Sequence, residues 1–372
     1  MHRPDQPGPF RRRGPRPLLL HLLPTPPPCW PASPISNASL QTSPAGLDPT
    51  LLAGIAAYRR HPYQRTLIDP AVVWEEGECR LLDYGNGRSG PPVLFVPSLV
   101  NRAYVLDLAP GRSMMRWLAN QGVRPLLLDW GWPGPAERGF TLTDYVAGRL
   151  FRALDTVNEP AVLAGYCMGG MLAMAAALLR PAAVRGLALL ASPWDFHAAD
   201  AMRARRLGEM LPLYDPVLDA TGTLPVDSIQ ALFALAEPGA VAAKYRAFAG
   251  FDQSSAAAAS FVALEDWLND GVPLAAPVAR ETLGGWYGAN TPARGVWQVA
   301  DRPVDPSALD TPTFIAIPDR DRIVPPEGAL PLARLIPRAV LHRSPAGHIG
   351  MAAGPRAEAA LWAPLLGWLR GL

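Results

Sequence analysis

Cysteine is scarce in this chain, and its spacing matches neither a disulfide framework nor a metal site. The three cysteines, Cys29, Cys79 and Cys167, are odd in number and lie far apart, whereas such frameworks and sites use even numbers or short pairs. We therefore expect no metal ion, no cofactor and a reducing compartment such as the cytoplasm. A catalytic thiol needs a compartment of that kind.

Net charge is also low, and Lys244 is the only lysine. The formal charge of +2 arises in residues 1–46, which hold five arginines and one aspartate; the rest of the chain has 29 basic and 31 acidic residues. Because the net charge of residues 47–372 is close to zero, we have no reason to expect nucleic-acid binding. No apolar run approaches the roughly 18 residues of a transmembrane helix, so we do not expect a membrane span.

Length and composition predict one large α/β domain with an insertion. The chain has 372 residues and is 49% apolar, which supports a sizeable core. Residues 1–46 are rich in proline and arginine. We expect them to form a disordered tail that is dispensable for catalysis, or to result from a wrongly assigned start codon. We assign the core to residues 47–195 and 306–372. Residues 196–305 show helical segments and many aromatics but no clear buried strand, which predicts a helical cap.

Apolar runs alternate with helical stretches through the core. The expected strands cover 78–84, 93–96, 125–128, 161–163, 184–190, 313–317 and 339–343, and the expected helices cover 47–65, 113–120, 143–157, 171–179, 328–335 and 357–372. This alternation predicts a mostly parallel, doubly wound sheet. Functional residues should then lie where the strands end, at one edge of the sheet.

The pattern Gly-x-Cys-x-Gly at residues 165–169 organises the candidate site. It resembles a nucleophile elbow with cysteine in place of serine, and it stands between an expected strand and an expected helix, as that turn requires. Small neighbours suit the strained backbone of such a turn. Cys167 would lie at a helix N-terminus, where a thiolate is favoured, and the Met168 N–H would face an oxyanion. A buried packing cysteine is the alternative.

Nucleophile, acid and histidine follow in the order that α/β hydrolases use. Cys167, Asp321 and His348 each come after an expected strand, so all three should meet at one sheet edge. The thiol would attack, the imidazole would accept its proton, and the carboxylate would orient the imidazole. Spacing alone does not separate Asp321 from Asp319.

The other histidines and aspartates fit the triad less well. Among the histidines, His197 is the serious rival of His348 because it also follows a strand. The rest lie in the tail, before the sheet or within a strand: His2, His21, His61 and His342. Asp129 and Asp195 stand beside other strands.

Several motifs together resemble the catalytic subunit of polyhydroxyalkanoate synthases, the polyester polymerases of bacterial storage granules. They lie at residues 96–108, 127–131, 165–170, 321–325 and 347–350. The resemblance implies an α/β-hydrolase fold, favours Asp321 over Asp319, and implies the Val100 N–H as a second oxyanion donor. Residues 286–290 faintly resemble a family stretch, which implies that Trp286 and Tyr287 contact substrate. Chain length resembles the short synthases, which act with a second subunit.

The resemblance implies that Cys167 attacks a 3-hydroxyacyl-CoA thioester and releases coenzyme A. It also implies contact with a polyester granule surface, and a second synthase subunit or a homodimer as partner. The residues themselves support only acyl transfer by a cysteine. A thioesterase, polyester depolymerase or esterase with the same triad stays open, as does a non-catalytic granule protein that keeps the fold.

Overall fold

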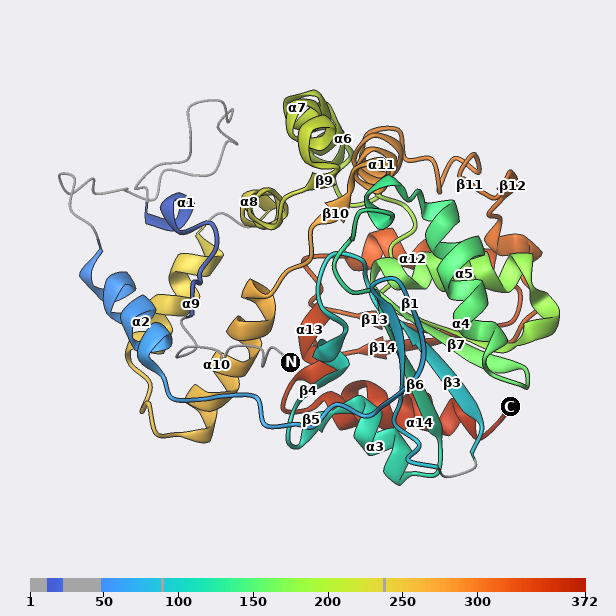
Figure 1. Cartoon of the computed structure of the whole chain (residues 1–372), viewed down its shortest axis with the longest axis horizontal. Helices are drawn as coiled ribbons and strands as arrows, with labels where there is room; N and C mark the ends of the chain where they lie inside the picture. Colours follow the sequence, from blue (N-terminus) through green and yellow to red (C-terminus); the bar gives the residue numbers. More distant parts are fainter. Residues whose placement is uncertain (1–11, 23–47, 88–89, 237–238) are drawn as a thin grey trace, which may run out of the picture. The chain divides into compact units, whose positions relative to one another are not determined.

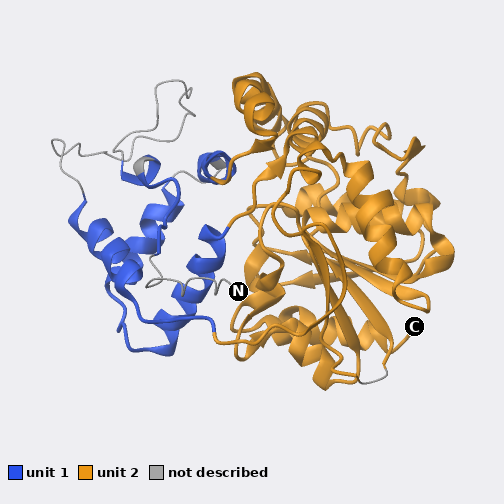
Figure 2. Ribbon diagram, viewed as in Figure 1, with its two compact units in different colours: residues 1–65, 227–270 blue, residues 66–226, 271–372 orange. Residues whose placement is uncertain are grey.

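The computed structural model describes residues 12–22, 48–87, 90–236 and 239–372. The chain divides into two compact units, coloured separately in Figure 2. The larger unit comprises residues 66–226 and 271–372, and the smaller one comprises the chain up to residue 65 with residues 227–270. The larger unit contains the main sheet, and the described part of the smaller one is helical.

An eight-stranded sheet forms the centre of the larger unit. Its strands are β1 (Ala71–Glu76), β2 (Cys79–Asp83), β3 (Pro92–Val96), β6 (Arg124–Asp129), β7 (Ala161–Tyr166), β8 (Val184–Leu190), β13 (Thr313–Pro318) and β14 (Ala339–Ser344). Their order is β1-β2-β6-β3-β7-β8-β13-β14. The β1–β2 and β2–β6 pairs are antiparallel, and all later neighbours run parallel. The predicted mostly parallel sheet is therefore confirmed.

Helices cover both faces of this sheet. Figure 1 shows α3 (Met114–Asn120) and α14 (Ala363–Leu369) on one face, and α4 (Phe151–Asp155), α5 (Met168–Leu179) and α12 (Pro326–Leu335) on the other. Strands β3, β7 and β13 are consequently buried along their whole length, as expected for strands covered on two sides. Strand β1 is mostly exposed, which explains why its sequence did not predict it.

Short elements connect the main ones. They are η1 (Ala103–Leu106), β4 (Asp107–Ala109), β5 (Arg112–Ser113), η2 (Glu137–Gly139), η3 (Asp144–Leu150), η4 (Pro181–Ala183), β11 (Gln298–Val299), β12 (Arg302–Pro303), η6 (Pro306–Ala308), α13 (His348–Ala353) and η7 (Glu358–Trp362). The expected helix over 143–157 is thus a π-helical turn followed by α4. The expected helix over 357–372 is likewise η7 followed by α14.

Part of the predicted cap belongs to the larger unit. It comprises α6 (Ala201–Glu209), α7 (Leu211–Thr221), α11 (Ala276–Arg280), the π-helix η5 (Glu281–Gly288), and the short antiparallel pair of β9 (Thr223–Leu224) and β10 (Leu274–Ala275). Helix α6 packs against η5, where a Cβ added to Gly208 would come within 2.5 Å of the Gly288 Cα.

The smaller unit is built from helices of three separate chain segments. They are α1 (Leu18–Leu22), α2 (Pro49–Arg60), α8 (Val226–Ala236), α9 (Ala240–Ala249) and α10 (Ala256–Asn269). Its core includes Leu51, Tyr58, Tyr245 and Phe248. Phe248 also stacks on Phe261 with ring centroids 4.2 Å apart. Burial of these rings accounts for much of the cap's aromatic content.

The domain boundaries therefore differ from those expected. Residues 48–65 belong to the smaller unit together with 227–270, and residues 196–305 are divided between the two units. The disordered tail is also a wrong prediction for residues 12–22; residues 1–11 and 23–46 lie outside the described chain. Local composition missed these contacts because they join segments that are far apart in the sequence, such as Arg12 and Asp266, which are 254 positions apart.

Arg12 connects the N-terminal segment to the other segments of the smaller unit. Its guanidinium binds both carboxylate oxygens of Asp266, at 2.7 and 3.0 Å, and also donates to the carbonyls of His61 and Tyr63. The Arg12 side chain is 4% exposed. The Tyr58 hydroxyl donates to the same carboxylate at 2.9 Å. Burial outweighs these contacts and raises the pKa of Asp266, so this carboxylate depends on its partners.

We expect Arg12→Met to destabilise the smaller unit by about 3 kcal/mol, because it removes one partner of a buried ion pair and leaves the other. Denaturant unfolding measures this loss. Arg16→Met is the matched control, since the Arg16–Asp227 pair is exposed and pairs of that kind contribute about 0–1 kcal/mol. Equal losses for the two variants would contradict the prediction.

Among the described residues, no helix combines the length and the apolar character needed to cross a membrane.

Candidate active site

Cys167 stands on a tight turn between β7 and α5. Its backbone has φ +56° and ψ −128°, a conformation that is strained for any residue with a Cβ. The Cys167 N–H donates to the Leu190 carbonyl at 2.8 Å, and the Cys167 carbonyl accepts from Gly170 N–H at 3.0 Å. Helix α5 begins at Met168, three residues before the expected start. Cys167 therefore lies directly at a helix N-terminus.

The glycines around Cys167 permit close approach of three backbone segments. A Cβ added to Gly165 would come within 2.3 Å of the Gly170 Cα, and one on Gly169 would come within 2.0 Å of the Val96 carbonyl. Real Cβ atoms do not approach neighbours so closely, because packed interiors leave no such room. The glycines thus hold α5 against β7 and against the end of β3, and fix the direction of the Cys167 side chain.

His348 and Asp321 form a buried pair beside Cys167. The His348 Nδ1 lies 2.7 Å from the Asp321 Oδ2, and their side chains are 7% and 0% exposed. The other oxygen of Asp321 accepts from the backbone N–H groups of Ile323 and Val324, at 2.9 and 2.8 Å. These bonds orient the carboxylate toward the imidazole.

Hydrogen bonds between two loops fix the relative positions of Asp321 and His348. The Asp319 N–H donates to Ser344 and the Arg320 N–H to Ala346, at 2.8 and 3.0 Å, which ties the loop after β13 to the loop after β14. The Tyr166 hydroxyl donates to the His348 carbonyl at 3.2 Å. Tyr166 was not singled out from the sequence, although its position before Cys167 at the end of a buried strand was a signal.

The surroundings of His348 favour its protonated form. Burial alone opposes the charge, but the negative charge of Cys167 and the hydrogen bond that His348 donates to Asp321 outweigh it and raise the pKa of His348 to about 10. This pKa exceeds the ordinary histidine value of 6.5. Protonation of His348 therefore adds to the free energy of unfolding, and this contribution is complete below pH 6.5. That contribution is lost as the pH rises through about 10.

The rival acid and histidine have other partners. Asp319 is half exposed and pairs with Arg343 on the surface. His197 Nε2 lies 2.7 Å from the Tyr287 carbonyl, and the Asp195 carboxylate accepts from the His197 N–H and from the Asn290 side chain, at 2.9 and 2.8 Å. His197, Asp195 and Asn290 thus anchor the end of η5, a positioning role that the sequence did not predict.

The remaining candidates also have structural partners or fall outside the described chain. His21, His61 and His342 each hydrogen-bond a backbone carbonyl. Asp129 binds two arginines. His2 lies outside the described residues.

The two expected oxyanion donors differ in their present bonds. Met168 is the first residue of α5, and among the described residues its N–H has no hydrogen-bond acceptor. The Val100 N–H donates to the Ser98 hydroxyl at 3.2 Å, while the Val100 carbonyl accepts from Val272 at 3.1 Å. Val100 must therefore exchange Ser98 for an oxyanion before it can stabilise one.

The structure separates Trp286 from Tyr287. Trp286 is 2% exposed and packs between Phe196 and Trp297, with ring centroids 5.6 and 5.3 Å away. Tyr287 is half-buried, and burial together with the charge of Cys167 raises its pKa to about 12. Phe196 contacts both rings, with a centroid distance of 4.9 Å for Tyr287. Tyr287 is the less buried member of the pair and the one whose ionisation the charge of Cys167 opposes, whereas Trp286 belongs to an aromatic core.

Within the described ranges no group of three or more histidine, cysteine or acidic side chains is arranged to hold a metal ion. The chemistry that these residues can support is nucleophilic attack by a thiol, assisted by an oriented imidazole and backbone N–H groups.

Comparison with known proteins supports this picture. A family model described as a thioesterase domain matches residues 133–324. A crystal structure of a carboxylesterase from the thaumarchaeon Nitrososphaera gargenis superimposes with a TM-score of 0.51 at 14% identity, covering 83% of this chain and 98% of that one. At 14% identity the match is evidence for the fold and not for the function. The expected α/β-hydrolase fold is confirmed.

Two relatives found by sequence have a higher identity to this chain than the carboxylesterase has. The chain is 30% identical to a poly(3-hydroxyalkanoate) polymerase subunit PhaC of Synechocystis, over 75% of this chain and 77% of that protein. It is 31% identical to the protein of that name from Haloferax mediterranei, over 80% of this chain. The matched region spans only 63% of the Haloferax protein.

Proposed function

Since the chain belongs to the family of poly(3-hydroxyalkanoate) polymerase subunits PhaC, we propose that it transfers 3-hydroxyacyl groups from coenzyme A thioesters to a growing polyester. The observation that carries this proposal is Cys167 at a strained turn, next to a histidine that Asp321 orients at 2.7 Å. A sulfur nucleophile suits a thioester because the acyl group passes between two sulfurs of similar chemistry.

The proposed cycle begins with a Cys167 thiolate beside protonated His348. The thiolate attacks the thioester carbon, and the N–H groups of Met168 and Val100 hold the negative oxygen that forms. Collapse of this intermediate breaks the bond to the coenzyme A sulfur, which leaves with the proton of His348. Neutral His348, oriented by Asp321, then accepts the proton of a hydroxyl group that attacks the acyl carbon on Cys167. The new ester forms as the bond to the Cys167 sulfur breaks, which restores the thiolate beside protonated His348.

Transfer and hydrolysis differ only in whether that hydroxyl belongs to a hydroxyacyl group or to water. The match to a thioesterase domain makes a hydrolase with the same residues the second candidate. We place the protein in the cytoplasm or at a polyester granule surface, with a second synthase subunit or another copy of itself as partner.

The deciding experiment is incubation of the purified chain with 3-hydroxybutyryl-CoA, following free thiol and products together. We expect thiol release with insoluble polyester. Thiol release with free 3-hydroxybutyrate alone would assign a thioesterase, and absence of selective acylation at Cys167 would leave a non-catalytic protein of this fold.

Tyr287 provides a test of water exclusion. We expect Tyr287→Asn to shift products from polyester toward free hydroxyacid while Cys167 is still acylated, because an amide at this place admits water near the sulfur. The product ratio measures the effect.

Trp286→Asn is the matched control, since it changes the neighbouring residue of the same π-helix. This variant should lose about 3 kcal/mol of stability by emptying a core position, together with total activity, and should keep the wild-type product ratio. A shifted ratio in Trp286→Asn alone would contradict the assignment of the two rings.

A further inference from the structure

A pocket separate from the triad opens beside the oxyanion loop. It has a volume of about 430 Å³ and is lined by Glu78, Arg80, Arg102, Trp132 and neighbouring residues. All of these residues belong to the larger unit. The size is in the range of sites for small organic ligands.

The pocket lies at the edge of the sheet where the catalytic residues stand. Arg80 pairs in register with Asp129, the last residue of β6, and Trp132 follows three positions later. Arg102 comes two residues after Val100. The Trp130 indole N–H also donates to the Pro97 carbonyl at 3.0 Å, which joins the two loops that carry Trp132 and Arg102.

The distance to Cys167 suits a long substrate. In the sheet, β6 is separated from β7 only by β3, so the strand that leads to the pocket and the strand that leads to Cys167 are roughly 10 Å apart. The extended pantetheine arm of coenzyme A exceeds this span. A thioester at Cys167 could therefore place its nucleotide end in the pocket.

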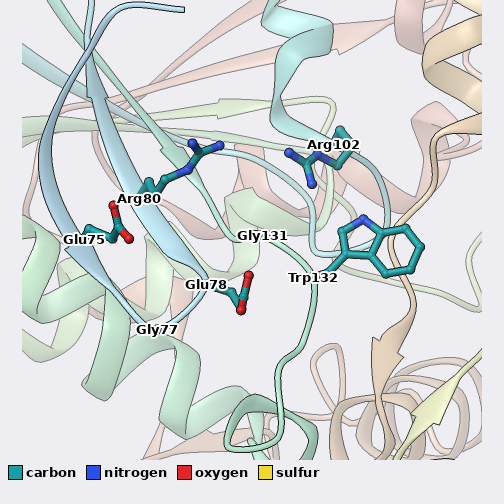
Figure 3. A pocket seen from close by; sticks show the side chains of 7 residues that line it. All are labelled: Glu75, Gly77, Glu78, Arg80, Arg102, Gly131 and Trp132. Atoms are coloured by element: carbon teal, nitrogen blue, oxygen red, sulfur yellow. The ribbon is translucent and has the colours of Figure 1, made fainter. Parts of the chain in front are cut away.

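Two arginines lie together on one side of the pocket. The guanidinium groups of Arg80 and Arg102 both bind the Asp129 Oδ2, at 3.0 and 3.3 Å, so two positive charges share one buried carboxylate. Their side chains remain 36% and 23% exposed. Figure 3 shows the two guanidinium groups turned toward one another. A phosphate group can bind such a pair.

The rest of the lining is aromatic and acidic. Trp132 is 46% exposed and stands beside Arg102 in Figure 3, with Glu78 across from the arginines. An exposed indole offers a stacking surface for a base, and a carboxylate accepts hydrogen bonds from an amino group or a ribose hydroxyl. Mixed charge of this kind fits a nucleotide better than a bare anion or cation.

We propose that this pocket binds the adenosine phosphate end of the coenzyme A thioester, with Arg80 and Arg102 on phosphate, Trp132 against adenine, and Glu78 on a donor group of the nucleoside. This inference rests on the proposed function. It makes the pocket a binding determinant for the carrier, separate from the acyl group at Cys167.

A binding experiment tests the pocket without turnover. The probe is 3′,5′-ADP, titrated calorimetrically into the full chain, with inorganic phosphate as a second titrant. We expect Trp132→Ala and Arg80→Met each to raise the Kd for 3′,5′-ADP about tenfold. Arg338→Met, which removes an exposed arginine at the opposite end of the sheet, should stay within about twofold.

Measurements of enzyme activity provide a second test of the pocket. With 3-hydroxybutyryl-CoA, Trp132→Ala and Arg80→Met should raise KM about tenfold at unchanged kcat. With the 3-hydroxybutyryl thioester of pantetheine, which lacks the nucleotide, both variants should match the wild type. Unfolding midpoints close to the wild type would show that the variants are folded.

Three results would overturn the pocket assignment. They are no binding of 3′,5′-ADP by the wild type, binding of inorganic phosphate as tight as that of 3′,5′-ADP, and equal losses with both thioesters. If the wild type processes neither thioester, the proposed function fails instead, and the 3′,5′-ADP titration still decides the pocket.

Discussion

Replacing Cys167 by alanine should reduce release of coenzyme A from 3-hydroxybutyryl-CoA by about 10⁴-fold or more, because the variant has no nucleophile to acylate. Stability should change little. Alanine keeps the Cβ and therefore the same strained backbone, and Cys167 is only half-buried. A free-thiol assay and mass spectrometry of the intact protein measure the two steps.

Cys79→Ala is the matched control for this experiment. Cys79 is fully buried, its sulfur donates to the Trp130 carbonyl at 3.4 Å, and burial raises its pKa to about 12. Loss of this thiol should cost about 1–2 kcal/mol of stability and leave acylation intact.

Serine at position 167 separates the two candidate chemistries. Cys167→Ser should be far weaker than the wild type, since a hydroxyl needs stronger activation than a thiol. Wild-type turnover in Cys167→Ala would refute the nucleophile, and equal activity of serine and cysteine would point to an esterase.

Replacing Asp321 by asparagine should lower kcat/KM by about 10⁴-fold, the loss typical of a triad that keeps its geometry but loses its carboxylate charge. The negative charge and hydrogen bond of Asp321 both support protonated His348, and burial opposes it. The pKa of His348 should therefore fall from about 10. Titration of the imidazole nitrogens by NMR measures this shift.

The rival acid of the same loop provides the control. Asp319→Asn removes a carboxylate that is 42% exposed and pairs with Arg343. It should leave both the pKa of His348 and kcat/KM near the wild type, because exposed pairs are weak. Equal effects of the two substitutions would mean that the acid has been assigned to the wrong residue.

Much of the larger unit was predictable because its elements depend on local patterns. The strand before Cys167 is apolar at almost every position, and burial on both faces requires this. Cys167, Asp321 and His348 each follow a strand of the parallel part of the sheet, which places them at one edge, since parallel strands end together. The Asp321–His348 hydrogen bond agrees with that reasoning.

What the sequence could not give depends on contacts between distant segments. Arg12 occurs in a proline-rich stretch with no periodicity, and its burial depends on Asp266, a residue of α10. The difference between Trp286 and Tyr287 is likewise tertiary, because adjacent residues on a π-helix face different surroundings. Composition treated both aromatics alike. Phe196 contacts both rings, whereas deeper burial and the contact with Trp297 distinguish Trp286.

The positive φ at Cys167 has a consequence for evolution of the sequence. It determines which residue selection would favour at this position if the catalytic activity were no longer needed. Glycine adopts a φ of +56° without strain, whereas a side chain there costs on the order of 1–3 kcal/mol. Selection for folding alone would therefore favour glycine at position 167. A related protein that only covered the surface of a storage granule would gain stability if glycine replaced this cysteine. That a cysteine is kept at a strained backbone position is what a lineage still under selection for acyl transfer would display.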